Sequence, residues 1–401
     1  MMMSSLKIYL TGLVWCLTSS AHAEWSLTEA RQAAFARDAQ LQWYQQQQAV
    51  IATKTAFAGQ PENPTLSTTL ENLGNSRLEQ LDGPSMSVQY SQTWTRPSKL
   101  ELREQVAGLA EQQRQLSLRQ RQAEVSAEVR LCLAEWAAAV DQQQLLAEDV
   151  QVAQLQSKYT QERFRAGRTV ESEAARMAAL EQEAQGLLSL QRTIVEHQKG
   201  SCALLLGDLP DTPIRLPIQL TTTALPSRSL AEQMAEFEQQ MRQQQAQLVQ
   251  AEKQRDVTWS VGLKTFAETG DASLMLGASV PLNRVNRHQV LQIEADQQAL
   301  YAQQQIPRQQ RISAHQLRQV QGEYQQLHAM LLILDQQVIP SSTQSLQIAQ
   351  RAYQAGKIDL LAWLEIRRSW RETQQRRIQT WLQINRVIAS LERQFDPLDV
   401  Y

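Results

Sequence analysis

The sequence has few residues that interrupt regular helices, with only 14 glycines and 12 prolines in 401 residues. Long stretches rich in Gln, Glu, Ala, Leu and Arg therefore predict a mainly helical chain. Cysteine is also scarce: apart from Cys16 there are only Cys132 and Cys202, both within stretches of Leu and Ala. In that setting cysteine most often serves as a small core residue, and a disulfide formed in an oxidising compartment is the alternative.

The motifs that mark common enzyme and ligand sites are absent as well. The sequence has no glycine-rich phosphate loop, no nucleophile elbow and no His-Glu-x-x-His pair. Four histidines have no partner at metal-ligand spacing, namely His197, His288, His315 and His328. The net charge of −2 gives no reason to expect nucleic acid as a partner. We therefore expect no enzyme activity, no cofactor and no tightly bound metal.

Residues 1–23 have the pattern of a secretory signal peptide. Lys7 precedes a short apolar run, and the small-x-small cleavage site Ala21-His22-Ala23 follows it. The run is too short for a membrane anchor, and the bulky Trp15 disfavours lipidation at Cys16. No later apolar run reaches the length of a membrane-spanning helix. We expect an exported chain without a transmembrane helix.

Between residues 257 and 284 the sequence reads VTWSVGLKTFAETGDASLMLGASVPLNR, and its hydrophobicity alternates with a period of two. Two alternating runs around a Gly-Asp turn predict a β-hairpin over residues 257–282. A weaker hairpin with a longer polar loop is predicted over residues 65–95. Small or polar residues separate the apolar side chains, so each strand has one apolar face.

The chain is a tandem repeat. RFRAGR aligns with RAYQAGK when Phe164 is placed over Tyr353, an offset of 189, and the hairpins align at an offset of 188. Removing 23 residues from 401 leaves 378, and half of 378 is also 189. The agreement predicts a duplicated unit, with a first repeat over residues 24–212 and a second over residues 213–401.

Each repeat has the same predicted order of elements. A first helix (residues 27–57 and 229–255) precedes the hairpin, and a long helix follows it (residues 98–163 and 286–351). The long helix ends at a glycine followed by a basic residue, near residues 167 and 356, and a returning helix comes next. Each long helix would extend on the order of 100 Å, although Pro307 and Pro340 are expected to kink or break the second. Helices of this length must pack side by side as coiled coils.

The four predicted strands have two interpretations. They could pack as a small β-sandwich, or their apolar faces could lie against lipid in a closed barrel, the β-architecture that a bilayer permits. Runs of about ten alternating residues suit membrane-spanning strands. Four strands are too few for a conducting barrel, but three chains would supply twelve. The lipid-facing candidates are Trp94, Trp259, Val261, Leu263, Leu274 and Leu276.

Over its length after residue 23, the chain resembles the TolC family of outer-membrane efflux proteins. The resemblance rests on the duplicated helix–hairpin–helix unit and on the paired motifs FRAGRTVESEAAR and AYQAGKIDLLAWLEIRRSW. NPTLSTTLENLG followed by MSVQYSQTW is similar to the branch that serves heavy-metal resistance–nodulation–division pumps, the CzcC-like proteins. The family and its branch thus rest on different parts of the sequence.

The resemblance implies a passive exit duct of a tripartite efflux system in the cell outer membrane. It implies a homotrimer whose twelve strands form a barrel and whose long coiled-coil helices form a hollow helical barrel in the periplasm. The implied partners are a periplasmic adaptor and an inner-membrane resistance–nodulation–division pump, and the branch implies heavy-metal cations as cargo. The alternatives are drug efflux or type I protein secretion through a TolC-like channel, a periplasmic adaptor, and a structural coiled-coil protein.

Each long helix ends at a candidate contact for the adaptor. The tip residues are Ala166, Gly167 and Arg168 in the first repeat and Ala355, Gly356 and Lys357 in the second. Glycine followed by a basic residue is also typical of an ordinary helix C-terminus, because glycine accepts the left-handed conformation and the cation complements the last carbonyls. The resemblance adds adaptor contact to that structural role.

The resemblance also implies a gate at the tips. Tyr353 matches an aromatic residue that holds the tip closed by hydrogen bonding, and Glu173 matches its acidic partner on the neighbouring hairpin. Glu365 matches the inner of two acidic positions around the aperture. Ala362 replaces the outer one and Ile358 replaces a basic position, so one carboxylate ring and one latch contact are missing. The alternative is that Glu173 and Glu365 are solvated acids on helix surfaces.

Overall fold

The computed structural model describes residues 26–73, 84–218, 228–282 and 287–395, so the predicted signal peptide lies outside the described residues. The helices are α1 (Leu27–Arg37), α2 (Ala39–Ala58), α3 (Pro97–Arg165), α4 (Glu171–Leu206), α5 (Leu230–Glu252), α6 (Arg287–Ile333), α7 (Ile339–Gln354) and α8 (Leu360–Gln394). The strands are β1 (Thr65–Glu71), β2 (Ser85–Trp94), β3 (Val257–Phe266) and β4 (Ala272–Ser279). A π-helical segment, η2 (Leu334–Val338), separates α6 from α7.

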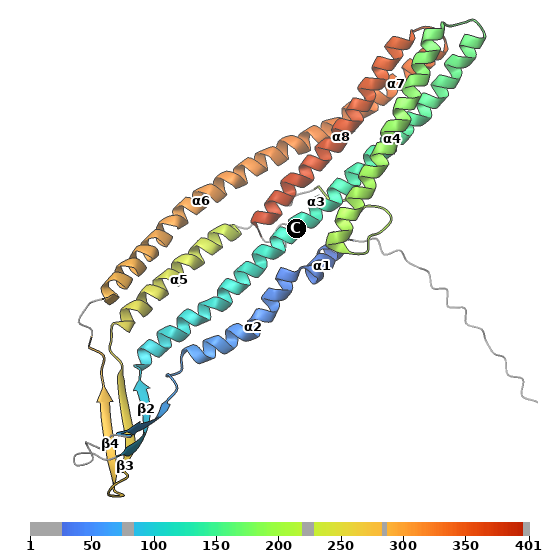
Figure 1. Cartoon of the computed structure of the whole chain (residues 1–401). Coiled ribbons are helices and arrows are strands. Elements are labelled where there is room, and N and C mark those ends of the chain that lie inside the picture. The colour runs from blue at the N-terminus through green and yellow to red at the C-terminus, as the bar shows by residue number, and fades with distance from the viewer. Residues whose placement is uncertain (1–25, 74–83, 219–227, 283–286, 396–401) are drawn as a thin grey trace, which may run out of the picture.

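The molecule is elongated, with the sheet at one end and the tight turns between helices at the other (Figure 1). α3 runs along most of this length, and its 69 residues correspond to about 100 Å of helix. Near the turns α3 packs against α4 and α8, and α8 packs against α7. The predicted fold class, mainly helical with a small β part, is confirmed.

The four strands form one antiparallel sheet in the order β1-β2-β3-β4. Both predicted hairpins are present, as β1–β2 and β3–β4. The central pair joins strands from the two halves of the chain, with Tyr90 opposite Val261 and Trp94 opposite Val257. Because directly opposite residues of an antiparallel pair share a face, this register places apolar residues of all four strands on the same side.

The helices next to the sheet form a layer in the same order as the strands. α2 contacts α3, α3 contacts α5, and α5 contacts α6. α2 leads into β1, β2 leads into α3, α5 leads into β3, and α6 follows β4. In the described part of the chain, sheet and layer therefore end together, at β1 and α2 on one side and at β4 and α6 on the other (Figure 1).

The helix predicted over residues 27–57 is in fact two helices. Asp38 between them has φ −70° and ψ 113°, an extended conformation. Its carboxylate accepts a hydrogen bond from the backbone N–H of Leu41 at 2.8 Å, which caps α2, and another from Nη2 of Arg121 at 2.8 Å. The prediction of one helix was wrong. The break is determined by the N-cap at Asp38 and by its ion pair with Arg121 of α3, and helix propensity contains no information on either interaction.

The second long helix is also divided, but at one of the two expected prolines. Pro307 lies inside α6 and does not end it. Pro340 lies in the first turn of α7, directly after the π-helical segment. Proline has no N–H for the carbonyl four residues earlier, and its ring needs room beside that carbonyl. The wider π-helical turn provides this room.

The core near the middle of the molecule lies where α1, α3 and α4 meet. Leu133 and Trp136 of α3 are buried there. Cys132 and Cys202 form a disulfide between α3 and α4, with their Cα atoms 5.6 Å apart. The disulfide was the alternative interpretation of these residues. It closes a segment of 70 residues that includes the first tip, and closing a loop of this length stabilises the fold by about 4 kcal/mol.

A buried ion cluster joins the C-terminal helix to the first half of the chain. The carboxylate of Glu392 on α8 is fully buried. It accepts hydrogen bonds from Nε of Arg130 on α3 and Nη2 of Arg31 on α1, both at 2.7 Å. Arg130 also donates to Oδ1 of Asn385 at 2.9 Å. The cluster therefore fixes α1, α3 and α8 relative to one another.

Candidate functional sites at the helical tips and on the sheet

Both long helices end in the same turn at the tip end of the molecule. Gly167 and Gly356 have φ of 67° and 70°, in the left-handed region that favours glycine. In the first tip the N–H of Gly167 donates to the carbonyl of Phe164 at 2.9 Å, and that of Arg168 donates to Arg163 at 2.8 Å. These two bonds define a Schellman motif, which satisfies the last carbonyls of a helix.

The second tip repeats this geometry. The N–H of Gly356 donates to the carbonyl of Tyr353 at 3.0 Å, and that of Lys357 donates to Ala352 at 2.8 Å. All six predicted tip residues are exposed, namely Ala166, Gly167, Arg168, Ala355, Gly356 and Lys357. The hydroxyl of Tyr159 donates to the carbonyl of Gln354 at 3.3 Å, so α3 is hydrogen-bonded to the second tip.

The structure brings Tyr353 and Glu173 together within one chain. Tyr353 is 2% exposed, and its hydroxyl donates to Oε1 of Glu173 at 3.4 Å. Its ring stacks on Trp363 with centroids 5.7 Å apart and an interplanar angle of 22°. Thr169 donates a hydrogen bond to the other oxygen of Glu173. Burial raises the pKa of the Tyr353 hydroxyl, so the group stays protonated as the donor.

Glu365 is not part of this group of residues. Its side chain is exposed on α8, two residues after the buried Trp363. Within the described chain it has neither a hydrogen bond nor an ion pair. The predicted aperture role of Glu365 therefore depends on other copies of the chain, and it stays a prediction.

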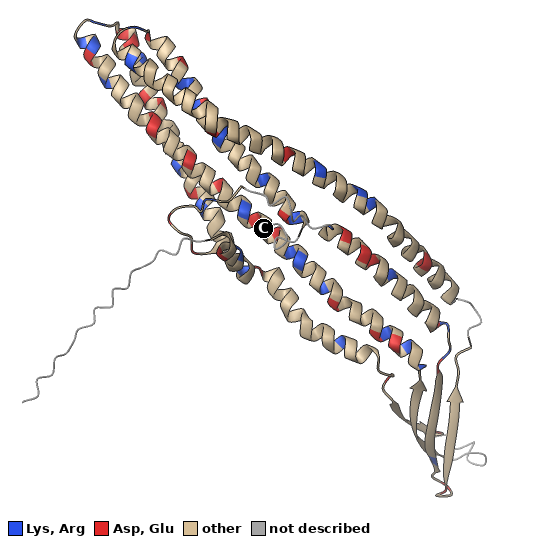
Figure 2. Cartoon of the chain, turned by 180° about the vertical axis from the view of Figure 1, so that it is seen from behind, with Lys and Arg blue, Asp and Glu red and all other residues tan. Residues whose placement is uncertain are grey.

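One face of the sheet is apolar and exposed. This apolar sheet face contains Leu66, Leu70, Met86, Val88, Tyr90, Trp94, Trp259, Val261, Leu263, Leu274 and Leu276. Leu276 is 76% exposed and Trp259 44%. The opposite face carries polar residues such as Ser87, Gln89 and Ser260, and charged residues are sparse over the whole sheet (Figure 2). All six predicted lipid-facing residues lie on the apolar sheet face.

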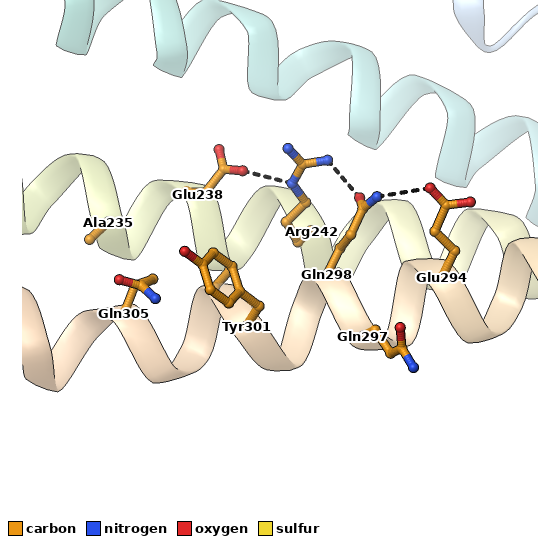
Figure 3. A pocket seen from close by; sticks show the side chains of 9 residues that line it. Ala235, Glu238, Arg242, Glu294, Gln297, Gln298, Tyr301 and Gln305 are labelled. Atoms are coloured by element: carbon orange, nitrogen blue, oxygen red, sulfur yellow. Dashed lines mark hydrogen bonds and ion pairs between the residues drawn. The ribbon is translucent and has the colours of Figure 1, made fainter.

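A groove of about 330 Å³ between α5 and α6 is lined by polar side chains that bond to one another (Figure 3). Nε of Arg242 pairs with Glu238 at 2.6 Å, and its Nη1 donates to Gln298 at 2.9 Å. Gln298 in turn donates to Glu294 at 3.3 Å. Because the cation of this groove already has a carboxylate partner, we assign no anion to it.

The described residues contain neither a metal-binding cluster nor a helix suited to span a membrane. No group of three or more His, Cys, Asp or Glu side chains in residues 26–395, outside the gaps, could hold a metal ion. None of the described helices combines the length and the hydrophobicity needed to cross a membrane.

One charged cluster near the tips was not predicted from the sequence. Asp149 on α3 is buried and accepts hydrogen bonds from Arg367 at 2.9 Å and Arg371 at 3.2 Å, both on α8. Spacing in the sequence could have placed the two arginines on one face of a helix, since they are four residues apart. Their shared partner lies 218 residues away from Arg367, and no local pattern indicates it.

Neither a protein-family model nor a curated protein sequence matches this chain. Its fold matches solved outer-membrane proteins, two of them described as channels, along nearly the whole chain. VceC of Vibrio cholerae is 16% identical, with 91% of this chain and 94% of VceC covered and a TM-score of 0.75. CmeC of Campylobacter jejuni is 12% identical, with 92% and 84% covered and a TM-score of 0.72. The open state of MtrE of Neisseria gonorrhoeae is 15% identical, with 92% and 88% covered and a TM-score of 0.63. The chain has a TolC-like outer-membrane channel fold.

Proposed function

We propose that this chain is the outer-membrane exit duct of a tripartite efflux system, a passive channel with a large periplasmic helical part. The observation that carries the proposal is the apolar sheet face, because a wide exposed apolar surface marks contact with lipid or a partner. β2 and β3 have ten residues each, within the length of about 9–11 that spans a membrane. Lipid would cover the apolar sheet face, and the polar face would line a water-filled lumen.

The free edges of the chain support closure into a ring of identical copies. β1 and β4 are the edge strands, and backbone groups at an open edge cannot lie in lipid. Pairing β4 of one copy with β1 of the next, and α6 with α2, is a head-to-tail contact that can close a ring. Exposed apolar residues suit such a helical seam: Trp43, Val50 and Phe57 on α2, and Val290, Ile293 and Leu300 on α6. The proposed ring is a homotrimer with twelve strands.

The tips are the proposed gate and adaptor contact. The bond from Tyr353 to Glu173 would hold α7 to the start of α4 in the closed state. Three copies of Glu365 around a three-fold axis would repel one another and attract cations entering the pore. With Ala362 and Ile358 in place of an acid and a base, this constriction would bind cations more weakly than two carboxylate rings would. Weak binding suits conduction.

The proposed partners are a periplasmic adaptor at the tips and an inner-membrane resistance–nodulation–division pump. Heavy-metal cations are the proposed cargo, on the sequence pattern of residues 63–94. Drug efflux and type I protein secretion are the alternatives for a channel of this fold. In a periplasmic adaptor or a structural coiled-coil protein, the apolar sheet face would be exposed to water.

Growth of a strain that lacks this chain tests the proposed function. We expect the strain to become sensitive to divalent metals, copper or silver, and the intact gene to restore growth. Sensitivity to drugs alone would agree with the exit duct but would contradict heavy-metal cations as its cargo. Growth equal to that of the parent strain on both panels would contradict the efflux role.

Gly356→Pro is expected to abolish efflux and spare the assembled channel. Proline cannot adopt φ of 70°, and it has no N–H for the carbonyl of Tyr353. The altered tip would no longer fit its partner, while the sheet lies at the far end of the molecule. The measurement is growth of the complemented deletion strain on the toxic solute, with the oligomer followed by gel electrophoresis without heating.

Gly356→Ala is the graded control for this variant. The surroundings of Gly356 are open, so the Cβ of alanine would meet no other atom. The substitution therefore destabilises the turn only through the positive φ, by about 1 kcal/mol. Efflux should therefore be largely retained. Full resistance of the proline variant would show that the turn is not a contact with a partner.

Tyr353→Phe combined with Glu173→Ala is expected to loosen the closed tip. The double variant removes the hydrogen bond between α7 and α4 but keeps the ring that stacks on Trp363. Its single-channel conductance in planar lipid bilayers should be higher than that of the parent channel. Glu171→Ala, an exposed acid in the same first turn of α4, is the matched control. A conductance equal to that of the parent would rule out the latch.

A further inference from the structure

The polar face of the sheet has two charged residues. Within the described strands, only Glu71 of β1 and Lys264 of β3 carry a charge. Lys264 lies directly opposite Ser87 of β2, and Ser87 lies opposite Thr69 of β1. Glu71 follows Thr69 by two residues on the same strand. Because residues two apart on a strand share a face, Lys264 and Glu71 project from the same polar side of the sheet.

The two side chains form an ion pair that crosses β2. Nζ of Lys264 donates to Oε2 of Glu71 at 2.7 Å, although β1 and β3 are not neighbours in the sheet. The residues of β2 between them are Ser85 and Ser87, whose short side chains leave room for the pair. The ring of Phe266 lies on the same face, with its centroid 5.5 Å from Nζ of Lys264. The pair therefore joins the first hairpin to the second.

The ion pair lies at the end of the sheet away from the helices. Trp94 and Val257 lie opposite each other at the other end, where β2 leads into α3 and α5 leads into β3. Glu71 is the last residue of β1, and Lys264 is two residues before the end of β3. In the proposed exit duct the polar face lines the lumen, so three copies would place three such pairs around the outer mouth of the pore.

Two opposite charges this close cancel for an ion that moves along the pore. The charged atoms are 2.7 Å apart, whereas the screening length at physiological salt is about 8 Å. Glu71 without its partner would act differently, because a ring of carboxylates attracts cations. Conduction requires that ions also leave the pore, so cations held at the outer mouth would slow their own export.

We propose that Lys264 neutralises Glu71 and so keeps the outer mouth of the pore without net charge. The strand-lined part of the duct then passes cations and anions alike, and any charge selection belongs to the helical part. The inference rests on the proposed function, which makes the polar face of the sheet the wall of a water-filled lumen. The ion pair itself lies within one chain, so its geometry does not depend on contacts between copies.

The test measures the ratio of potassium to chloride permeability from reversal potentials of the purified full-length protein in planar lipid bilayers. The potassium chloride gradient is on the order of 0.01 M, where the screening length is about 30 Å. Glu71→Gln leaves three lysines without partners and should lower the ratio about threefold. Lys264→Gln leaves three carboxylates and should raise it about threefold. Both shifts should vanish at about 1 M salt, where the screening length is about 3 Å.

Two double variants test whether cancellation of charge is responsible. Glu71→Gln combined with Lys264→Gln removes both charges, and Glu71→Lys combined with Lys264→Glu exchanges them. Both double variants should have the permeability ratio of the parent protein. Glu268→Gln is the matched control for the loss of one carboxylate. Glu268 is exposed in the turn after β3, beyond the last residue of the strand, so this variant should shift the ratio far less than Glu71→Gln.

The inference is overturned if neither single variant changes the permeability ratio, or if the double variants keep a shifted ratio. Loss of the oligomer in both single variants would also overturn it, because the pair would then serve to hold the two hairpins together. A protein that conducts ions with the same ratio in every variant contradicts the neutral mouth alone. A protein that forms no conducting pore contradicts the exit duct, and the neutral mouth with it.

Discussion

Trp259→Asp is expected to prevent assembly of this protein in the outer membrane. Trp259 lies on the apolar sheet face, packed beside Tyr90 with ring centroids 5.7 Å apart. On the lipid side of a barrel strand, a charge costs about 2 kcal/mol near the middle of the bilayer. The proposed homotrimer would incur this cost in each of its three copies, which disfavours the assembled state. The measurement is the yield of heat-stable oligomer in the membrane fraction.

Ser260→Asp is the matched control for this variant. Ser260 is the next residue of β3 and points to the opposite, polar face, where it lies across from Ser91. A carboxylate there would face water in the lumen, so assembly should be retained. Normal oligomer from Trp259→Asp would mean that the apolar sheet face is not the lipid face.

Glu392→Ala is expected to cause the largest loss of folding stability among single substitutions in the helical part. Glu392 is fully buried and carries the negative charge between Arg130 and Arg31. Removing it leaves the buried guanidinium of Arg130 and the partly buried one of Arg31 without that partner, and breaking a buried ion pair in this way costs about 3–5 kcal/mol. The midpoint of urea unfolding, followed by the far-ultraviolet circular dichroism of the helices, should fall accordingly.

Glu372→Ala is the control on the same helix. Glu372 pairs with Arg368, but both side chains are largely exposed, and such pairs contribute little to stability. The midpoint should remain close to that of the parent protein. If the two variants had equal midpoints, the buried cluster would not stabilise the junction of α1, α3 and α8.

Local patterns predicted the elements that local forces determine. The alternation of residues 257–264 has a period of two, and β3, Val257–Phe266, contains these residues. Gly167 and Gly356 were expected at helix ends, and both have the positive φ that this role requires. In each case the deciding interactions lie within a few residues of one another, so the sequence alone contains them.

Tertiary contacts determined what the sequence did not predict. The break at Asp38 depends on Arg121, 83 residues later in the chain. The central strand pair β2–β3 joins residues about 170 positions apart, as Tyr90 and Val261 show. Pairing partners at such distances leave no local signal. The same holds for Arg130 and Glu392, which meet across 262 residues.

Of the two side-chain clusters near the tips, the sequence indicated the residues of one and not those of the other. Resemblance to a family supplied Tyr353 and Glu173, and the structure places their side chains within hydrogen-bonding distance in one chain. It did not supply Asp149 with Arg367 and Arg371, because that cluster depends on how α8 packs against α3. Packing between helices is set by the whole fold, so charged residues on two helices cannot be paired from their spacing alone.

Native mass spectrometry of the protein extracted by detergent from isolated outer membranes tests the central claim most directly. We expect a single assembly with three times the mass of one chain. A monomer recovered from the periplasmic fraction without detergent would contradict it, because the apolar sheet face would then neither contact lipid nor belong to a closed ring.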